Sequence, residues 1–255
     1  MSSMHYDFRY DAAVPDRYRG TFLFVVSHMR SYSSLLCHIL GSHPEISGYS
    51  EAQLSYFGRN DLQRLARTVR EHTGEPALKR YVLDKLLHNK REIAPDILRR
   101  PDVRCLFLLR NAPDTIASIL NMAHALQSTG DYSDPARVVA YLAERLTQMA
   151  AYAPLVRGRA LFVESERLLD DTAARLDRIA QWLGLAEPLS PEYRTFRHTG
   201  QRGHGDPSPH IRAGRIVASD ADRHRDYVPI VVADDLLERA DAAYARCRAA
   251  LAHLR

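Results

Sequence analysis

The sequence predicts a three-layer α/β fold in which a central parallel sheet is flanked by helices. Three observations support this class. The chain has 255 residues, several short apolar runs are continuous rather than alternating, and amphipathic helical patterns separate these runs. Strands covered on both faces of a parallel sheet have such runs, and helices form the crossovers between them. We expect one domain spanning 1–255, because this length suffices for a single large core.

The first part of the chain contains a strand and the helix that follows it. Residues 1–19 are polar and aromatic, which predicts an irregular arm. Residues 22–26 are apolar and partly β-branched, which indicates a buried strand. Ser33 or Ser34 suits the N-cap of a helix whose leucine and isoleucine side chains recur at helical spacing. Helical patterns further predict helices at 51–57 and 61–72.

The rest of the chain continues this alternation. Residues 81–87 predict a second strand with Lys85 near its end. The run VRCLFLL at 103–109 predicts a third, and Pro113 suits the first turn of the helix at 115–126. The remaining predictions are a helix at 135–152, a strand at 160–163, a helix at 171–185, a long Gly-, Pro-, His- and Arg-rich loop at 199–216 and a C-terminal helix at 232–255. Loops of that length in compact domains are usually functional or disordered.

The composition is typical of a folded protein that tolerates anionic ligands. The sequence has 45% hydrophobic and 26% charged residues and a formal net charge of +4. Cys37, Cys105 and Cys247 are widely spaced, without a CxxC pair or a zinc-ligand pattern, so we expect reduced thiols and no metal. The N-terminus lacks an apolar signal-peptide core, and no run approaches the roughly 18 apolar residues of a membrane span. A cytoplasmic protein is therefore expected.

The turn between the first strand and the first helix has the features of an anion site. It reads SHMRSYSS at 27–34. Free backbone N–H groups at a helix start attract anions, and Arg30 adds a positive charge just before them. The turn lacks the GK[ST] ending of an ATPase P-loop, which disfavours a nucleotide kinase.

A second basic turn follows the strand at 103–109. Arg110 ends this strand, and Ser118 lies about two turns into the next helix. Because ligands of parallel sheets bind at the carboxyl ends of the strands, we expect both side chains to converge on one phosphate. The two basic turns together predict a ligand with a phosphate at each end.

These motifs resemble, in order, those of the sulfotransferases that use 3′-phosphoadenosine-5′-phosphosulfate (PAPS). MRSYSSLLCHILGSHPE is similar to their 5′-phosphosulfate loop, of the form PRSGTTLL, with its helix and HPE, and RNAPDTIASIL is similar to their 3′-phosphate motif. KRYVLDKLLHN, SERLLDDTAARLDRIAQWLGL and QRGHGDP resemble three further family segments. The resemblance spans roughly residues 20–216 and is to the bacterial and tyrosylprotein-like branch. It implies a P-loop-like fold, PAPS as sulfuryl donor, 3′,5′-adenosine bisphosphate (PAP) as product, and no metal.

The resemblance also implies a role for each motif residue. Glu51 matches the general base of the tyrosylprotein branch, and Lys85 matches a lysine that reaches the transferred group. Arg30 is a further catalytic position, and His28, inside the loop, is the alternative base. Tyr32 stands where the family has a loop glycine. The cofactor-binding positions correspond to Arg30, Ser31, Tyr32, Ser33, Ser34, Arg110, Ser118, Arg202 and Gly203.

Two other functions stay open at this point. They are a nucleotide-dependent phosphotransferase and a non-catalytic nucleotide- or RNA-binding protein. Nucleic acid is not the expected partner, because the basic residues fall at two motifs and not along one stripe. The expected acceptor is a small molecule, a carbohydrate or a peptide, and Tyr49, Tyr56 and Phe57 either line its pocket or belong to the core. The sequence predicts neither the identity of the acceptor nor the oligomeric state.

Overall fold

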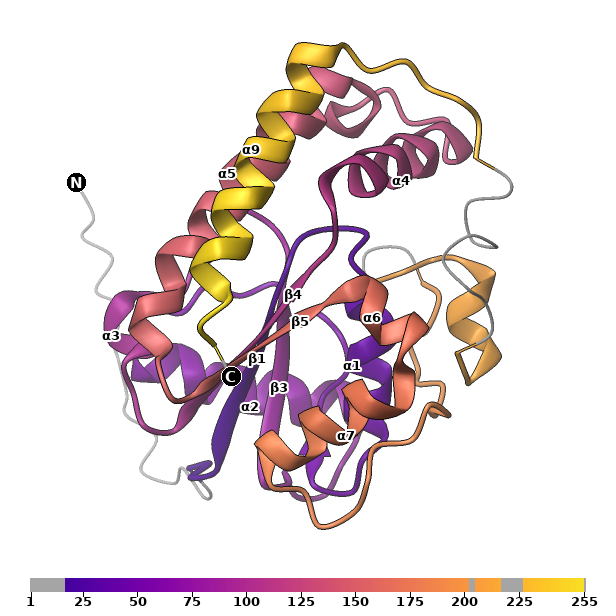
Figure 1. Ribbon diagram of the computed structural model, residues 1–255. Helices are drawn as coiled ribbons and strands as arrows, with labels where there is room; N and C mark the ends of the chain where they lie inside the picture. Colours follow the sequence, from indigo (N-terminus) through magenta and orange to yellow (C-terminus); the bar gives the residue numbers. More distant parts are fainter. Residues whose placement is uncertain (1–16, 202–204, 217–226, 255) are drawn as a thin grey trace, which may run out of the picture.

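The structure is a computed structural model that describes residues 17–201, 205–216 and 227–254. Most of the predicted arm at 1–19 and the predicted cofactor residues Arg202 and Gly203 lie outside these ranges. Within them, the chain forms a central sheet between two layers of helices (Figure 1). The predicted fold class is therefore confirmed. None of the helices in the described ranges combines the length and the apolar character that a membrane span needs.

The sheet has five parallel strands in the order β2-β3-β1-β4-β5. Their bounds are β1 Thr21–Val26, β2 Ile46–Ser47, β3 Tyr81–Leu86, β4 Val103–Leu109 and β5 Ala160–Glu164. At the centre, Val26 of β1 lies opposite Leu86 of β3 and Phe107 of β4. All four predicted strands are confirmed. The sequence did not predict β2, because a strand of two residues carries no periodic pattern.

Two layers of helices bury the faces of the sheet (Figure 1). One layer contains α2 Arg59–Thr73, α3 Pro95–Leu98, α4 Ala112–Ala125, α5 Pro135–Tyr152 and α9 Asp234–Leu251. The other contains α1 Ser33–Ser42, α6 Ser165–Asp170 and α7 Thr172–Leu183. Short 3₁₀ helices lie in connections, at η1 Asp131–Ser133, η2 Ala153–Val156 and η3 Pro209–Ala213. Side chains of β1 alternate between the layers, so that Phe24 packs on one face and Val25 on the other.

The long predicted helices are confirmed, α5 with the predicted ends and the others with shifted ends, and α3 and α6 are additional. The predicted N-cap of α1 is wrong, because Tyr32, and neither Ser33 nor Ser34, occupies that position. Helix α4 begins three residues before the predicted start, because Asn111 caps it by accepting a hydrogen bond from Asp114 N at 2.9 Å. The predicted helix at 171–185 corresponds to α7, and α6 ends at Asp170, so that the non-helical residue Asp171 separates the two helices. Part of the predicted loop at 199–216 forms η3.

The predicted helix at 51–57 is wrong. This segment has no regular secondary structure apart from a parallel bridge between Tyr56 and Ile93. The backbone N–H of Ala52 donates to the Asp84 carboxylate at 2.7 Å instead of to a helical carbonyl. A helix would break both contacts, because its N–H groups bond within the helix.

Asp84, buried within β3, holds this segment in place. Its Oδ1 accepts the bond from Ala52 N, and its Oδ2 accepts a hydrogen bond of 2.5 Å from the Tyr56 hydroxyl. Burial raises the pKa of Asp84 to about 6. Asp84 therefore fixes the backbone directly after Glu51.

The connections that leave β1 and β4 diverge at the carboxyl end of the sheet. Helix α1, which follows β1, covers one face, and α4, which follows β4, covers the other. Open α/β sheets bind ligands in the crevice at such a point. The buried Arg145 of α5 braces this end, since its Nε donates to Ser27 O and its Nη2 to Leu86 O, both at 2.6 Å.

We predict that Asp84 makes stability depend on pH. Its raised pKa means that the folded chain holds the proton more tightly than the unfolded chain. The stability that Asp84 contributes is therefore present below the unfolded pKa and is lost as the pH rises through the folded value. Urea unfolding should show that the wild type loses up to about 3 kcal/mol relative to Asp84→Asn between about pH 4 and pH 7.

Asp96→Asn is the matched control, because the Asp96 side chain is 95% exposed. Its difference from the wild type should stay constant over the same pH range. A constant difference for Asp84→Asn as well would contradict the account of Asp84.

Candidate active site

The segment 27–32 between β1 and α1 is a tight loop held by its own serine hydroxyls. Ser27 Oγ donates to Leu108 O of β4 at 2.6 Å, and Ser31 Oγ donates to His28 O at 2.7 Å. Ser165 of α6 adds a bond from its hydroxyl to Ser31 O at 2.9 Å. The hydroxyl of the predicted cofactor residue Ser31 therefore stabilises the conformation of the loop.

Arg30 and Tyr32 both have left-handed backbone conformations, each with a φ of 61°. Such angles favour glycine and cost other residues roughly 1–2 kcal/mol. Tyr32 therefore adopts a conformation that suits glycine, at the position where the resembled motif has one. Its ring lies beside Arg110, whose guanidinium carbon is 4.7 Å from the ring centre.

A cavity of about 460 Å³ brings the two basic motifs together at the carboxyl end of the sheet. Arg30 Nε donates to Ser118 Oγ at 2.9 Å, and Arg110 Nη1 donates to Arg30 O at 3.1 Å. Arg110 is buried, so its charge lies in a medium where electrostatic interactions are strong. The predicted residues in the lining are Arg30, Ser31, Tyr32, Ser33, Ser34, Glu51, Arg110 and Ser118.

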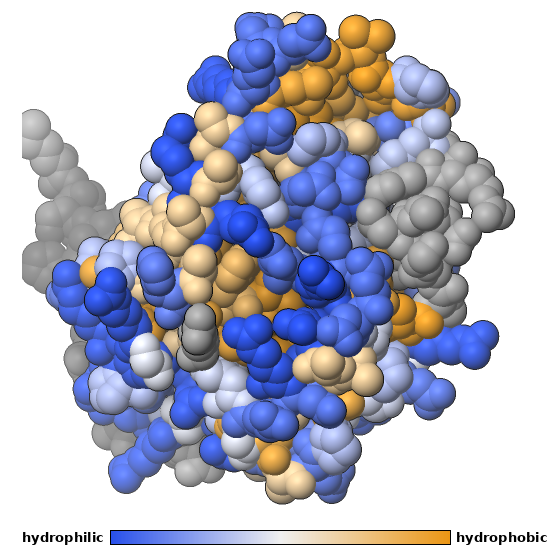
Figure 2. Space-filling model, in the orientation of Figure 1, coloured by the Kyte–Doolittle hydropathy of each residue, from blue (hydrophilic) through white to orange (hydrophobic). Residues whose placement is uncertain are grey.

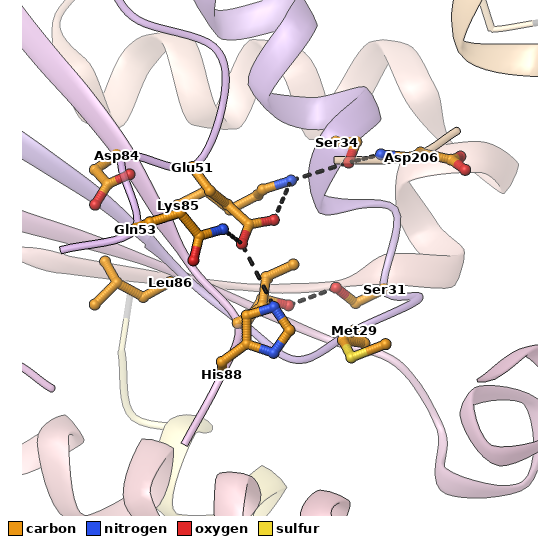
Figure 3. A network of polar contacts seen from close by, with 12 residues as sticks. Met29, Ser31, Ser34, Glu51, Gln53, Asp84, Lys85, Leu86, His88 and Asp206 are labelled. Carbon is orange, nitrogen blue, oxygen red and sulfur yellow. Dashed lines mark hydrogen bonds and ion pairs between the residues drawn. The ribbon is translucent and has the colours of Figure 1, made fainter. Parts of the chain in front are cut away.

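Lys85 contacts both the start of α1, directly after the loop 27–32, and Glu51, the predicted base (Figure 3). Its Nζ donates to Ser34 Oγ at 2.9 Å and lies 3.3 Å from Glu51 Oε1. The Lys85 side chain is completely buried, and only 8% of Glu51 is exposed. Glu51 reaches the cavity, and Lys85 supports both its carboxylate and the start of α1.

His28, the alternative base, is buried behind the loop. Its Nδ1 donates to Met29 O at 2.9 Å, and its Nε2 accepts a hydrogen bond from Arg110 N at 3.1 Å. Burial lowers the pKa of His28 to about 4, so the ring is neutral at neutral pH. Both ring nitrogens are engaged by the backbone, and His28 does not belong to the described lining of the cavity. Of the two predicted bases, Glu51 alone belongs to the described lining of the cavity.

The side chains around Glu51 were not among the predicted site residues (Figure 3). Gln53 Nε2 donates to Glu51 Oε2 at 3.0 Å, and His88 Nε2 lies 3.6 Å from the same oxygen. Burial lowers the pKa of His88, although Glu51 opposes this effect. His88 follows Lys85 by three residues within the motif KLLHN, which was the signal available in the sequence.

Asp206, from the predicted loop at 199–216, was also missed. Its Oδ1 accepts a hydrogen bond of 3.1 Å from Arg30 Nη1, and its backbone N–H donates to Ser34 Oγ at 3.0 Å. Burial opposes ionisation, but Arg30 and hydrogen bonds from Ser208 outweigh it and hold the pKa of Asp206 below its usual value. Arg30 therefore already binds one carboxylate, as expected of a side chain that recognises anions.

Tyr227 brings a third distant segment to the cavity. Its hydroxyl donates to Ser118 Oγ at 2.7 Å. The neighbouring backbone N–H of Val228 donates to Asn121 Oδ1 at 2.7 Å and secures this segment along α4. No motif in the sequence indicated Tyr227.

The three aromatic residues that follow the loop take other places. Among the described residues that line the cavity, Tyr49, Tyr56 and Phe57 are absent. Tyr49 is buried and stacks on Phe196 with ring centres 4.0 Å apart, and Tyr56 is buried against Asp84. Phe57 is 65% exposed. Within the described ranges, no group of three His, Cys, Asp or Glu side chains is arranged as metal ligands would be.

This arrangement provides two chemical capabilities in one cavity. Arg30, Arg110 and Ser118 supply hydrogen-bond donors for anionic groups. Glu51 supplies a carboxylate that accepts a proton, next to the buried ammonium of Lys85.

Comparisons with known proteins find similar structures but no sequence family. No family model and no curated protein matches this sequence. The sulfotransferase domain from the curacin biosynthetic pathway is similar with a TM-score of 0.58 and 16% identity, covering 90% of this chain and 99% of that one. The sulfotransferase domain of the Synechococcus PCC 7002 olefin synthase is similar with a TM-score of 0.58 and 19% identity, covering 89% of this chain and 96% of that one. The chain therefore has the fold of these sulfotransferase domains.

Proposed function

We propose that the protein is a sulfotransferase that transfers a sulfuryl group from PAPS to a hydroxyl group, or an amine, of an acceptor. One observation carries this proposal. The basic motifs around Arg30 and Arg110 meet with Ser118 at a cavity that also contains Glu51. The occurrence of the same fold in two sulfotransferase domains supports it.

The residues of the cavity fit a donor with anionic groups at two ends. Arg30 and the first turn of α1 would bind the 5′-phosphosulfate, where backbone N–H groups add to the charge. Arg110 and Ser118 would bind the 3′-phosphate. A Cβ atom on Gly205 would lie 2.9 Å from Ser34 Oγ, so glycine lets the segment with Asp206 approach this turn closely.

The side chains around Glu51 suit an in-line transfer. A bond forms between the acceptor oxygen and sulfur, the bond between sulfur and the phosphate oxygen breaks, and PAP leaves. Glu51 would take the proton of the acceptor hydroxyl. Lys85 would offset negative charge that develops on the leaving phosphate oxygen, from its position between Glu51 and Ser34. The contribution of the protein is mainly positioning and electrostatic stabilisation, as in phosphoryl transfer.

Neither alternative function has comparable support. The loop 27–34 has no lysine at the position that a P-loop phosphotransferase uses. A nucleic-acid-binding protein presents its cations on the surface, whereas Arg110 is 2% exposed and the Arg30 side chain 23% exposed.

We predict that PAP binding depends on Arg110. Calorimetric titration with PAP should give a sub-millimolar Kd for the wild type, and Arg110→Ala should weaken it about 10- to 100-fold, because a charged hydrogen-bonding group is lost. Arg110→Lys keeps the charge without the planar fork, and its affinity should be intermediate.

Arg157→Ala is the matched control, because Arg157 is exposed and lies outside the described lining of the cavity. Its Kd for PAP should equal that of the wild type. If the wild type does not bind PAP, the proposed donor is wrong. It is also wrong if the folded variants Arg110→Ala and Arg110→Lys bind PAP as tightly as the wild type does.

We predict that Glu51→Gln abolishes most of the transfer and spares the donor site. In assays with labelled PAPS and an acceptor that the wild type uses, kcat should fall about 10²- to 10⁴-fold, because the general base is lost. The Kd for PAP should change little. Since the substitution leaves Lys85 without its carboxylate partner, a thermal unfolding scan is needed to show that the variant is folded.

A folded Glu51→Gln variant with the kcat of the wild type would rule out Glu51 as the base. His88 would then be the nearest alternative, because its Nε2 lies 3.6 Å from Glu51 Oε2.

A further inference from the structure

The part of the cavity beyond Glu51 has a different character from the part around the arginines. Its wall is made mainly of aliphatic, thioether and aromatic side chains: Met29, Leu87, Met122, Leu126 and Tyr132. Met29 and Leu87 are buried, with 8% and 7% exposure. We propose that the acceptor is an uncharged alcohol carried on an extended apolar molecule. This inference rests on the proposed sulfotransferase function and specifies its acceptor.

The side chains that α4 presents to the cavity change from polar to apolar along the helix. Ser118, Met122 and Leu126 follow one another at intervals of four residues, a spacing that places side chains on the same side of a helix. All three line the cavity. Ser118 is buried at the arginine end, and Leu126, just after the last turn, is 40% exposed. The apolar part of an acceptor can therefore extend along α4 from the reacting group to the solvent.

The charges of the lining oppose an anionic acceptor. Arg30 and Arg110 are the only lysine or arginine side chains in its described part, and both belong to the arginine end. Beyond them, the lining carries the carboxylate of Glu51, whose ammonium partner Lys85 is fully buried. A sulfated sugar or an acidic peptide would bring negative charge there without a cation to receive it.

The polar side chains of this part are already engaged with one another. Gln53 and His88 contact Glu51, and the Tyr132 hydroxyl lies 3.5 Å from His88 Nδ1. Ser128 Oγ accepts a hydrogen bond of 3.3 Å from Gly130 N. A carbohydrate needs partners for several hydroxyls at once, whereas these groups are placed to receive a single one beside Glu51.

The surface of this end of the molecule also carries an apolar patch. Apolar side chains gather where the chain passes α4 and rises to α9 (Figure 2). Val228, which bonds to Asn121 of α4 through its backbone, is 46% exposed, and Val231 is 92% exposed. An apolar acceptor longer than the cavity would leave it next to apolar surface.

The test measures the binding of straight-chain primary alcohols, from 1-butanol to 1-decanol, to protein saturated with PAP. Calorimetry should show the affinity rising about fourfold for each added methylene group while the chain lies along α4. Glucose and a tyrosine-containing acidic peptide should bind at least tenfold more weakly than 1-octanol. With labelled PAPS, the bound alcohols should be converted to their sulfate esters.

Met122→Gln tests the apolar wall without a large change in volume. It should weaken 1-octanol binding at least tenfold and leave the Kd for PAP unchanged. Leu126→Ser, at the exposed end, serves the same purpose if Met122→Gln does not fold. Phe57→Ser is the control, because Phe57 is exposed and lies outside the described lining.

An error in the donor assignment and an error in the acceptor class give different results. If PAP does not bind, the proposed function itself is wrong. If PAP binds but alcohol affinity is independent of chain length, or glucose or the acidic peptide binds more tightly than 1-octanol, the acceptor class is wrong and the donor assignment stands. Unchanged 1-octanol binding in both wall variants would also overturn the inference.

Discussion

The buried ammonium group of Lys85 is the contact on which the rest of the site depends. It reaches Ser34 at the start of α1 and Glu51 on the irregular segment after β2 (Figure 3). A charge at this depth must be compensated, because an isolated buried ion is strongly destabilising. Lys85 therefore fixes the distance between the start of α1 and the carboxylate of Glu51. Asp84, the preceding residue of β3, fixes the backbone after Glu51 independently.

Positive charge is concentrated at the carboxyl end of the sheet although the formal net charge of the chain is only +4. Arg145 donates to the carbonyls at the ends of β1 and β3, beneath the loop that carries Arg30. Arg110 donates to the carbonyl of Arg30 and lies against the ring of Tyr32. These contacts to neutral groups hold the cations in place, while Asp206 and Glu51 pair with Arg30 and Lys85. Arg30 and Arg110 are thus held in fixed positions at the cavity, and a preorganised cation binds an anionic group without a large cost of reordering.

The sequence predicted the parts of the fold and the site that are local or periodic. The continuous apolar runs identified four strands, and the turns that follow two of them contain Arg30 and Arg110. The convergence of these turns could be predicted because parallel strands present their carboxyl ends at one edge. The prediction for 51–57 failed because the apolar spacing of this segment resembles that of a helix, whereas its backbone bonds to Asp84 of β3.

Contacts over long sequence separations could not be predicted in this way. Asp206 lies 176 residues from Arg30, and Tyr227 lies 109 residues from Ser118. Their positions depend on how the chain after α7 returns across the sheet, and no local pattern encodes that path. The apolar lining of α4 has a similar origin. The spacing of Met122 and Leu126 is visible in the sequence, but their exposure to a cavity rather than to the core is decided by packing.

A ³¹P NMR titration of PAP with the wild-type protein can show whether both phosphates of PAP are bound. PAP has two phosphorus resonances, one for each phosphate. We expect both resonances to shift, because the loop with Arg30 and the pair of Arg110 and Ser118 would contact different ends of PAP. A titration in which only one resonance shifts, or neither does, would contradict a two-ended donor site.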